Sequence, residues 1–351
     1  MVHKYVTPTA QICWPLLCER AGCEVWVKHE NHTPVGSFKV RGGLVYMENL
    51  KRAGRAEAGV IAATRGNHGQ SVAFAARAYG VPSTVVVPHG NSVEKNRAMV
   101  ALGAELVEHG HDFNAALDYA VGLADERGLH MFPSFDDLLV HGVASYTTEL
   151  LTKSPGLHTL YVPLGMGSGI CGAIAARDSL RKATRIVGVI SDEAPTYALS
   201  FDAKQPIPTD TADTLADGLA VRIPNKDALM TILEGAERIV SVSEEQILAA
   251  MSYYFSDTHN IAEGAGAATL PTPCDPCAVA NAVTMFGSGR CSVRRLASLV
   301  DLIACCASAF HCAALWAALL ASSLALAASC AILAASACLT SSSVTAPWSD
   351  S

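Results

Sequence analysis

The stretch VIAATRGNHGQSVAFAARAYGVPSTVVVP, residues 60–88, contains the pattern that decides the fold. Its first four residues are apolar and predict a buried strand, and residues 84–88 predict a second strand rich in valine. Between them, apolar residues at three- and four-residue steps predict a helix over 69–79, which Gly80-Val-Pro82 ends. A strand, a helix and a strand at this spacing indicate a parallel sheet covered by helices on both faces.

The same alternation continues towards the C-terminus. Further strands are expected at 105–107, 159–163 and 186–190, and further helices at 92–102, 113–127 and 170–182. Ser92 is expected to cap the first of these helices. The sequence therefore predicts an α/β fold, and its 351 residues correspond to about two domains.

Composition limits the classes of function that fit this chain. Half of the residues are hydrophobic, and the net charge is −7 at pH 7. This mild acidity gives no electrostatic reason to bind nucleic acid. The N-terminus has no long apolar run followed by a small-residue cleavage site, so we expect no signal peptide, a cytoplasmic location and reduced thiols.

The composition changes abruptly after residue 270. Eight of the twelve cysteines lie between Cys274 and Cys338, and residues 302–349 contain no Asp, Glu, Lys or Arg. Three interpretations compete: a membrane span over 315–339, a packed core helix, or translation from a shifted reading frame. The abrupt change favours the third. Residues 271–351 are therefore treated as an atypical Ala/Ser/Cys-rich tail, and no membrane association is expected unless this tail is genuine.

A lysine stands in an unusual setting directly behind Gly36-Ser-Phe38. Ser37 is expected to cap a helix that begins here and places Lys39 in its first turn. Apolar residues then fall on one helical face, namely Val40, Leu44, Met47 and Leu50. The positive helix end and burial would both lower the pKa of the lysine, and a neutral lysine forms Schiff bases with aldehydes. An ordinary lysine near a helix start would give the same spacing.

Two loops offer groups that could bind a ligand. Residues 64–68, Thr-Arg-Gly-Asn-His, follow a strand and open a helix, which is where open α/β sheets bind ligands. Their N–H groups could hold an anion such as a carboxylate. Residues 165–169, Gly-Met-Gly-Ser-Gly, are in the same position after a later strand and fit a phosphate cup. Each pattern alone is also compatible with a tight turn.

Other catalytic patterns are not found. Cys274-x-x-Cys277 has no second cysteine or histidine pair nearby, so zinc is not expected. The sequence has neither an H-E-x-x-H motif nor a G-x-S-x-G nucleophile elbow.

Taken together, the motifs resemble those of the pyridoxal-phosphate enzymes of the serine/threonine dehydratase group, which have the tryptophan synthase β-like fold (fold type II). The matching motifs, besides the glycine-rich loop, are Pro34-x-Gly-Ser-Phe-Lys-x-Arg-Gly42, Gly66-Asn-His-Gly-Gln70, Leu102-Gly-Ala-Glu105 and Glu263-Gly-Ala-Gly-Ala267. The resemblance covers about residues 5–270. It implies two doubly wound parallel-sheet domains with pyridoxal 5′-phosphate in the cleft between them. The large domain would comprise residues 1–40 and 151–270, and the small domain residues 41–150.

The resemblance also implies roles for individual residues. Lys39 would bind the cofactor aldehyde and later act as the base at the substrate Cα. Phe38 and Glu263 would lie beside the cofactor ring, and Asn67 would bond its 3′-oxygen. The cofactor phosphate would be bound by Gly165, Met166, Gly167, Ser168 and Gly169. The substrate carboxylate would be received by Thr64, Gly66, Asn67 and His68. No metal is expected, because Ile190 and Thr196 stand where carboxylate ligands would be sought.

The implied reaction is the conversion of a β-hydroxy amino acid, of the threonine or serine type, into a 2-oxo acid and ammonia. A racemase would need a second acid–base group, commonly a serine in a loop, which residues 112–134 do not clearly supply. The last strand of the family, with its Ser/Thr-Gly-Gly-Asn turn, is not recognised after Leu270, where Met285-Phe-Gly-Ser-Gly289 is only a faint similarity. Without that strand the chain would be a catalytically impaired remnant. A homodimer acting on a small amino acid is expected.

Overall fold

The computed structural model describes residues 1–154 and 156–270 and the strand at 282–285. The strands are β1 (Gln11–Cys13), β2 (Val25–Lys28), β3 (Val60–Ala63), β4 (Ser83–Val87), β5 (Glu105–Glu108), β6 (His130–Met131), β7 (Thr159–Pro163), β8 (Arg185–Ser191), β9 (Arg238–Val242) and β10 (Ala282–Met285). These strands alternate with helices as the sequence predicts, so the α/β class is confirmed.

The α-helices are α1 (Pro15–Ala21), α2 (Lys39–Arg52), α3 (Asn67–Ala78), α4 (Val93–Ala101), α5 (Phe113–Arg127), α6 (Asp137–Lys153), α7 (Ser168–Ser179), α8 (Thr196–Ala203), α9 (Lys226–Gly235), α10 (Glu244–Thr258) and α11 (Gly264–Ala267). Short 3-10 helices are η1 (Val2–Lys4), η2 (Glu30–His32) and η3 (Asp217–Leu219). Every helix predicted above is present, with ends that differ by up to three residues.

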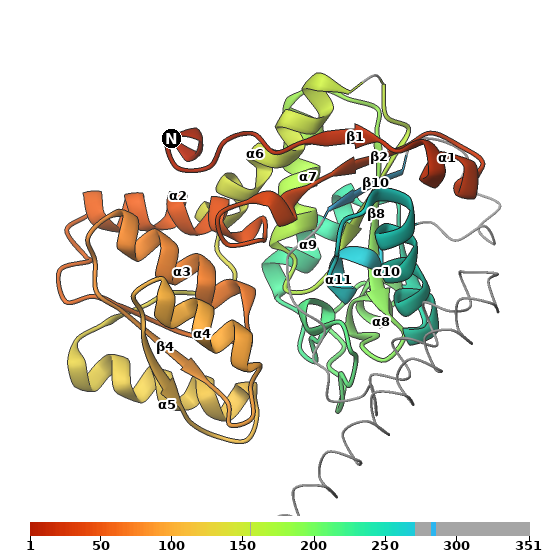
Figure 1. Cartoon of the computed structure of the whole chain (residues 1–351). Helices are drawn as coiled ribbons and strands as arrows, with labels where there is room; N and C mark the ends of the chain where they lie inside the picture. Colours follow the sequence, from red (N-terminus) through yellow and green to blue (C-terminus); the bar gives the residue numbers. More distant parts are fainter. Residues whose placement is uncertain (155, 271–281, 286–351) are drawn as a thin grey trace, which may run out of the picture. The chain divides into compact units, whose positions relative to one another are not determined.

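The stretch 60–88 forms the centre of a four-stranded parallel sheet with the order β5-β4-β3-β6. All four residues of β3 are buried, as expected for a strand with both faces covered. Val60 and Ala62 pack into the cluster that includes α2 and α3, whereas Ile61 and Ala63 pack against α5. In Figure 1 these elements are orange to yellow, with β4 among α3, α4 and α5.

The second parallel sheet has the order β7-β8-β9, and a third sheet has the order β1-β2-β10. In the third sheet β1 pairs with β2 antiparallel and β10 pairs with β2 in parallel, which the sequence did not predict. No strand was recognised in the sequence after Leu270, but β10 begins at Ala282. The absence of the family's last turn, and the impaired activity expected from it, remain predictions. The remaining tail, 271–281 and 286–351, with its three interpretations, lies outside the described residues. Among the residues that are described, no helix has the length and apolar character needed to cross a bilayer.

Helix α2 begins at Lys39, and its predicted apolar face is confirmed, since Val40, Leu44 and Met47 are fully buried. The prediction that Ser37 caps this helix is wrong. Phe38 takes the N-cap position, and the Ser37 N–H instead donates to Thr33 Oγ1 at 2.9 Å, in a turn that precedes the helix. The predicted cap of α4 is confirmed, because the Ser92 hydroxyl accepts from a backbone N–H in the first turn.

A buried ion network anchors the start of α2. Arg41 donates from Nε to Glu30 of η2 at 2.7 Å and from Nη2 to Glu149 of α6 at 3.2 Å. Lys28 of β2 donates to the other side of the same network, to Glu149 at 2.6 Å. Burial alone would raise the pKa of Glu149, but hydrogen bonds from Arg41 and Lys28 outweigh it and lower the pKa to about 2. The network thus joins four separate elements directly beside Lys39.

The described residues all belong to one compact unit. The two parallel sheets are nonetheless separate, with the first built from residues 60–131 and the second from residues 159–242. The proposed division into a domain of 41–150 and a domain of 1–40 with 151–270 remains a prediction.

Candidate active site

The predicted site residues line two adjoining cavities. The inner cavity, of about 50 Å³, is lined by Phe38, Lys39, Asn67, His68, Gly165, Met166, Gly167, Ser168, Gly169 and Glu263, among others. The outer cavity, of about 700 Å³, is lined by Thr64, Gly66 and further residues. Lys39, Asn67 and His68 line both. The start of α2, the carboxyl end of β3 and the carboxyl end of β7 therefore meet at one place, as the rule for open α/β sheets requires.

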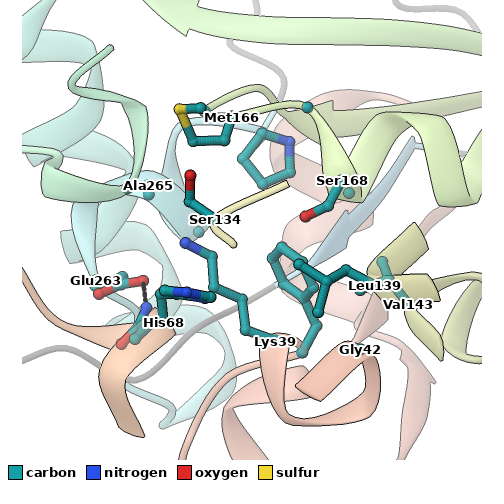
Figure 2. A pocket seen from close by; sticks show the side chains of 18 residues that line it. Lys39, Gly42, His68, Ser134, Leu139, Val143, Met166, Ser168, Glu263 and Ala265 are labelled. Carbon is teal, nitrogen blue, oxygen red and sulfur yellow. Dashed lines mark hydrogen bonds between the residues drawn. The ribbon is translucent and has the colours of Figure 1, made fainter. Parts of the chain in front are cut away.

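The Lys39 amine points into the inner cavity, towards the side chain of Ser134 (Figure 2). Burial lowers the pKa of Lys39, although the nearby carboxylate of Glu263 acts in the opposite direction. The backbone at this point is held in place, because the Ser71 hydroxyl of α3 donates to the Lys39 carbonyl at 2.7 Å. The close packing of α3 on α2 requires Gly43, where a Cβ would overlap the same hydroxyl. Lys39 is thus a positioned amine with reduced basicity.

Two acceptors beside Lys39 are buried and have no partner among the described residues. They are Oδ1 of Asn67 and Nε2 of His68. The amide nitrogen of Asn67, in contrast, has a partner, since it donates to Glu263 Oε1 at 2.7 Å. Burial, and then the charge of Lys39, lower the pKa of His68 to about 3, so its ring is neutral. Buried polar atoms are almost always paired, and unpaired ones at a cavity wall indicate where a ligand would bond.

Glu263 comes from the far side of the cavity, at the N-terminal end of α11. Its carboxyl group is buried, and burial raises its pKa, against the opposing effects of Lys95 and Asn67. The dashed line in Figure 2 marks its hydrogen bond to Asn67. Glu263 thus closes the inner cavity on the side opposite α7.

The glycine loop at 165–169 leads into the start of α7 and could hold an anion. Gly167 is the N-cap residue of α7, it has φ of 102°, and no side chain caps the helix. The first N–H groups of α7 are therefore open to an anion. A Cβ at Gly165 would overlap the carbonyl oxygen of Gly218, so this position tolerates only glycine without rearrangement.

These residues fit pyridoxal phosphate. Lys39 offers an amine for the aldehyde, and the loop before α7 offers an uncapped helix start for the phosphate. Asn67, which lines the same cavity, offers an unpaired acceptor that suits a polar ring substituent. Phe38 lies on the wall of the same cavity, with its ring edge-to-face against Tyr146 at 5.6 Å between centroids.

The structure adds three residues to the site: Ser134, Lys95 and Asp217. Lys95 and Asp217 were not considered as site residues from the sequence, whereas Ser134 was discounted within the range 112–134. Ser134 comes shortly after β6, and the strand-end rule would have found it if this two-residue strand had been recognised. Lys95 lies on a helix whose start was predicted, but nothing in the pattern indicated that its amine turns inwards. Asp217 lies in a 3-10 helix, which has no periodic signal. The described residues contain no cluster of three or more His, Cys, Asp or Glu that could hold a metal.

Replacing Gly165 by alanine is expected to weaken pyridoxal-phosphate binding at least about tenfold, because the added Cβ must displace the loop or the Gly218 carbonyl. Titration of the apoprotein, followed by cofactor absorbance, measures this effect. Gly122→Ala is the matched control, since a Cβ there meets nothing within 4 Å. Equal cofactor affinity for wild type and Gly165→Ala would contradict the assignment of the loop.

The sequence and the fold of this chain are similar to those of known proteins. An L-threonine ammonia-lyase of Geobacter sulfurreducens is 36% identical over 270 residues, which are 77% of this chain and 67% of that protein. The mitochondrial threonine dehydratase of Saccharomyces cerevisiae is 33% identical over 258 residues, which are 72% of this chain and 45% of that protein. The structure of the processed form of threonine deaminase isoform 2 from Solanum lycopersicum gives a TM-score of 0.78 at 28% identity, covering 85% of this chain and 90% of that one.

The chain thus spans between about half and two thirds of the length of these curated relatives. A family model described as "Pyridoxal-phosphate dependent enzyme" matches residues 2–275, a range that contains every residue of the site described above. The family binds the cofactor that the cavities fit. This chain therefore belongs to the pyridoxal-phosphate-dependent enzymes.

Proposed function

We propose that the protein is a dehydrating ammonia-lyase that converts a β-hydroxy amino acid of the threonine or serine type into a 2-oxo acid and ammonia. The observation that carries the proposal is the meeting of the Lys39 amine with the loops 64–68 and 165–169 at adjoining cavities. The names of the Geobacter and yeast relatives favour threonine as the substrate.

The loop at 165–169 would hold the cofactor phosphate, and Phe38, Asn67 and Glu263 would surround its ring. When bound, pyridoxal phosphate supplies an electron sink that stabilises negative charge on the substrate Cα. The protein has to place the substrate Cα within reach of a base and to hold its carboxylate.

The carboxylate would meet the start of α3. Thr64 Oγ1 accepts from the N–H groups of Gly66 at 2.9 Å and Gly69 at 3.2 Å, and so fixes the shape of the loop. Thr64 can still donate its hydroxyl proton, since the oxygen acts as acceptor in both of these bonds. Helix α3 begins at Asn67 without a capping side chain, which leaves its first N–H groups for an anion.

Lys39 would take the proton from the substrate Cα at Nζ. Its lowered pKa keeps a larger share of the amine neutral, and the neutral ring of His68 adds no competing positive charge. Loss of the β-hydroxyl as water then gives an enamine, which hydrolyses to the 2-oxo acid and ammonia. A base in this position contributes about 100- to 10,000-fold to the rate.

Incubation of the purified holoenzyme with L-threonine is expected to yield 2-oxobutyrate and ammonia in equal amounts. D-threonine is expected to react at less than about a tenth of that rate, because the same loop must hold the carboxylate while Lys39 reaches Cα from one side. A coupled 2-oxo acid reductase assay measures both. Failure to release a 2-oxo acid from L-threonine and from L-serine would contradict the proposal.

A second candidate, amino-acid racemisation, is favoured by one observation. Ser134 lines both cavities, and its side chain lies beyond the Lys39 amine (Figure 2), so a serine does face the site. Incubation with L-serine and chiral chromatography decides between the two activities. Pyruvate is expected in excess over D-serine, and the reverse ratio would make racemisation the main activity.

We also propose that the protein is a homodimer. From the family resemblance we expect a homodimer, with about twice the chain mass of 36.7 kDa in light scattering. The expected location, from the absence of a signal-peptide pattern, is the cytoplasm.

A further inference from the structure

The outer cavity contains a second buried amine, that of Lys95 on α4. Only 7% of this residue is exposed, although lysine is rarely buried without a partner. Its partner is Asp217 of η3, with 2.9 Å between Nζ and Oδ2. The ion pair therefore joins the part of the chain built on the β3–β6 sheet to the part built on the β7–β9 sheet.

The Lys95 side chain lies directly against the loop at 64–68. A Cβ placed on Gly66 would be 2.6 Å from Lys95 Cδ and 3.2 Å from its Nζ. The ammonium group is thus beside the segment that receives the substrate carboxylate in the proposed reaction. Glycine at position 66 is what allows this close approach.

Lys95 has hydrogen-bonding capacity left over. An ammonium group has three donors, and in the described residues the side-chain hydrogen bond of Lys95 is the one to Asp217. The other charged groups around it are Glu263, Arg65 and Lys39, and Arg65 also approaches Asp217 at 3.6 Å. Burial would lower the pKa of Lys95, but Glu263 and Asp217 outweigh it and raise the pKa, so the group stays charged.

The two amines of the site are therefore in opposite environments. Lys39 is held in its less basic form and Lys95 in its charged form. When the environments of two like titratable groups shift their pKa values apart, the two groups commonly take different roles in an active site. Lys39 suits nucleophilic and base chemistry, whereas Lys95 suits the binding of an anion.

We propose that Lys95, held by Asp217 beside Gly66, binds the substrate α-carboxylate together with the N–H groups of the loop 64–68. Selection for a carboxylate over a neutral group of the same size would then depend on this ammonium. The inference rests on the proposed function, because it takes its substrate class from that reaction.

The test compares two small probes on the holoenzyme. Glycine and glycinamide both have an amine that can react at the Lys39-linked cofactor and change its absorbance, but only glycine has a carboxylate. Lys95→Met is expected to raise the dissociation constant of glycine by about 10- to 100-fold and that of glycinamide by less than about twofold. Lys95→Arg, which keeps the charge, is expected to recover most of the affinity for glycine.

Lys226→Met is the matched control, because Lys226 lines the same cavity but is exposed. It removes the same charge and is expected to change neither constant by more than about twofold. If Lys95→Met fails to bind the cofactor, the comparison of glycine with glycinamide is made on Lys95→Arg instead. Equal weakening of glycine and glycinamide in Lys95→Met, or no weakening of either, would overturn the inference.

The outcome is separable from that of the proposed reaction. If the wild-type enzyme released no 2-oxo acid yet showed the glycine-specific loss, the reaction would be wrong and the carboxylate site would stand. If turnover of L-threonine were found and Lys95→Met kept wild-type affinity for glycine, the reaction would stand and the role of Lys95 would be refuted.

Discussion

Lys39→Ala is expected to lower the rate of 2-oxobutyrate formation from L-threonine by about 1,000-fold or more. The change removes the amine that would both hold the cofactor aldehyde and take the Cα proton. The variant is expected to fold, because the Lys39 side chain makes no hydrogen bond within the described residues, and Val40 and Leu44 still bury α2. Steady-state assays with added pyridoxal phosphate measure the loss.

Lys51→Ala is the control for this variant, since Lys51 lies on the same helix but is exposed. It is expected to keep wild-type activity and wild-type cofactor absorbance. More than about a tenth of wild-type activity in Lys39→Ala would show that another base serves the reaction.

Arg41→Met is expected to lower the free energy of unfolding by about 3–5 kcal/mol. Arg41 is fully buried between Glu30 and Glu149, and both carboxylates are also buried. Methionine fills part of the space but leaves two negative charges with Lys28 as their remaining buried cation. A loss of this size is a large part of the 5–15 kcal/mol that stabilises a typical domain.

The shift of the urea midpoint of the holoenzyme measures this loss. Arg52→Met is the matched control on the same helix, because its side chain is 77% exposed and its partner Glu48 lies one turn away. It is expected to change stability by less than about 0.5 kcal/mol. An Arg41→Met variant with the wild-type midpoint would show that the buried network adds nothing to stability.

The sequence predicted the parts of the fold that depend on local periodicity. The strands at 60–63 and 159–163 have the expected bounds, because burial of both sheet faces leaves apolar runs between turns. The helix at 113–127 also has the expected bounds, because Asp112 caps its start and Gly128 ends it in the left-handed conformation. Strand β6 has only two residues, which is too short for a hydrophobic period to be recognised in the sequence. Strand β10 has only four and also lies after the change in composition.

The sequence predicted those residues of the candidate site that lie at the start of a helix. Lys39, the loop 64–68 and the loop 165–169 each stand where a helix starts, which fixes their direction. Ser37 does not cap α2 because it lies one residue before the N-cap position, which Phe38 occupies, and it belongs to the preceding turn with Thr33. The sequence did not predict Lys95 and Asp217 as site residues. Their ion pair joins residues 122 positions apart, which only the tertiary structure reveals.

The position of the cofactor linkage tests the central claim most directly. Borohydride reduction of the holoenzyme, followed by proteolysis and mass spectrometry, is predicted to place one pyridoxyl group on the peptide that contains Lys39. A pyridoxyl group on Lys95 or Lys226, the other lysines that line the outer cavity, or on no lysine at all would contradict the account.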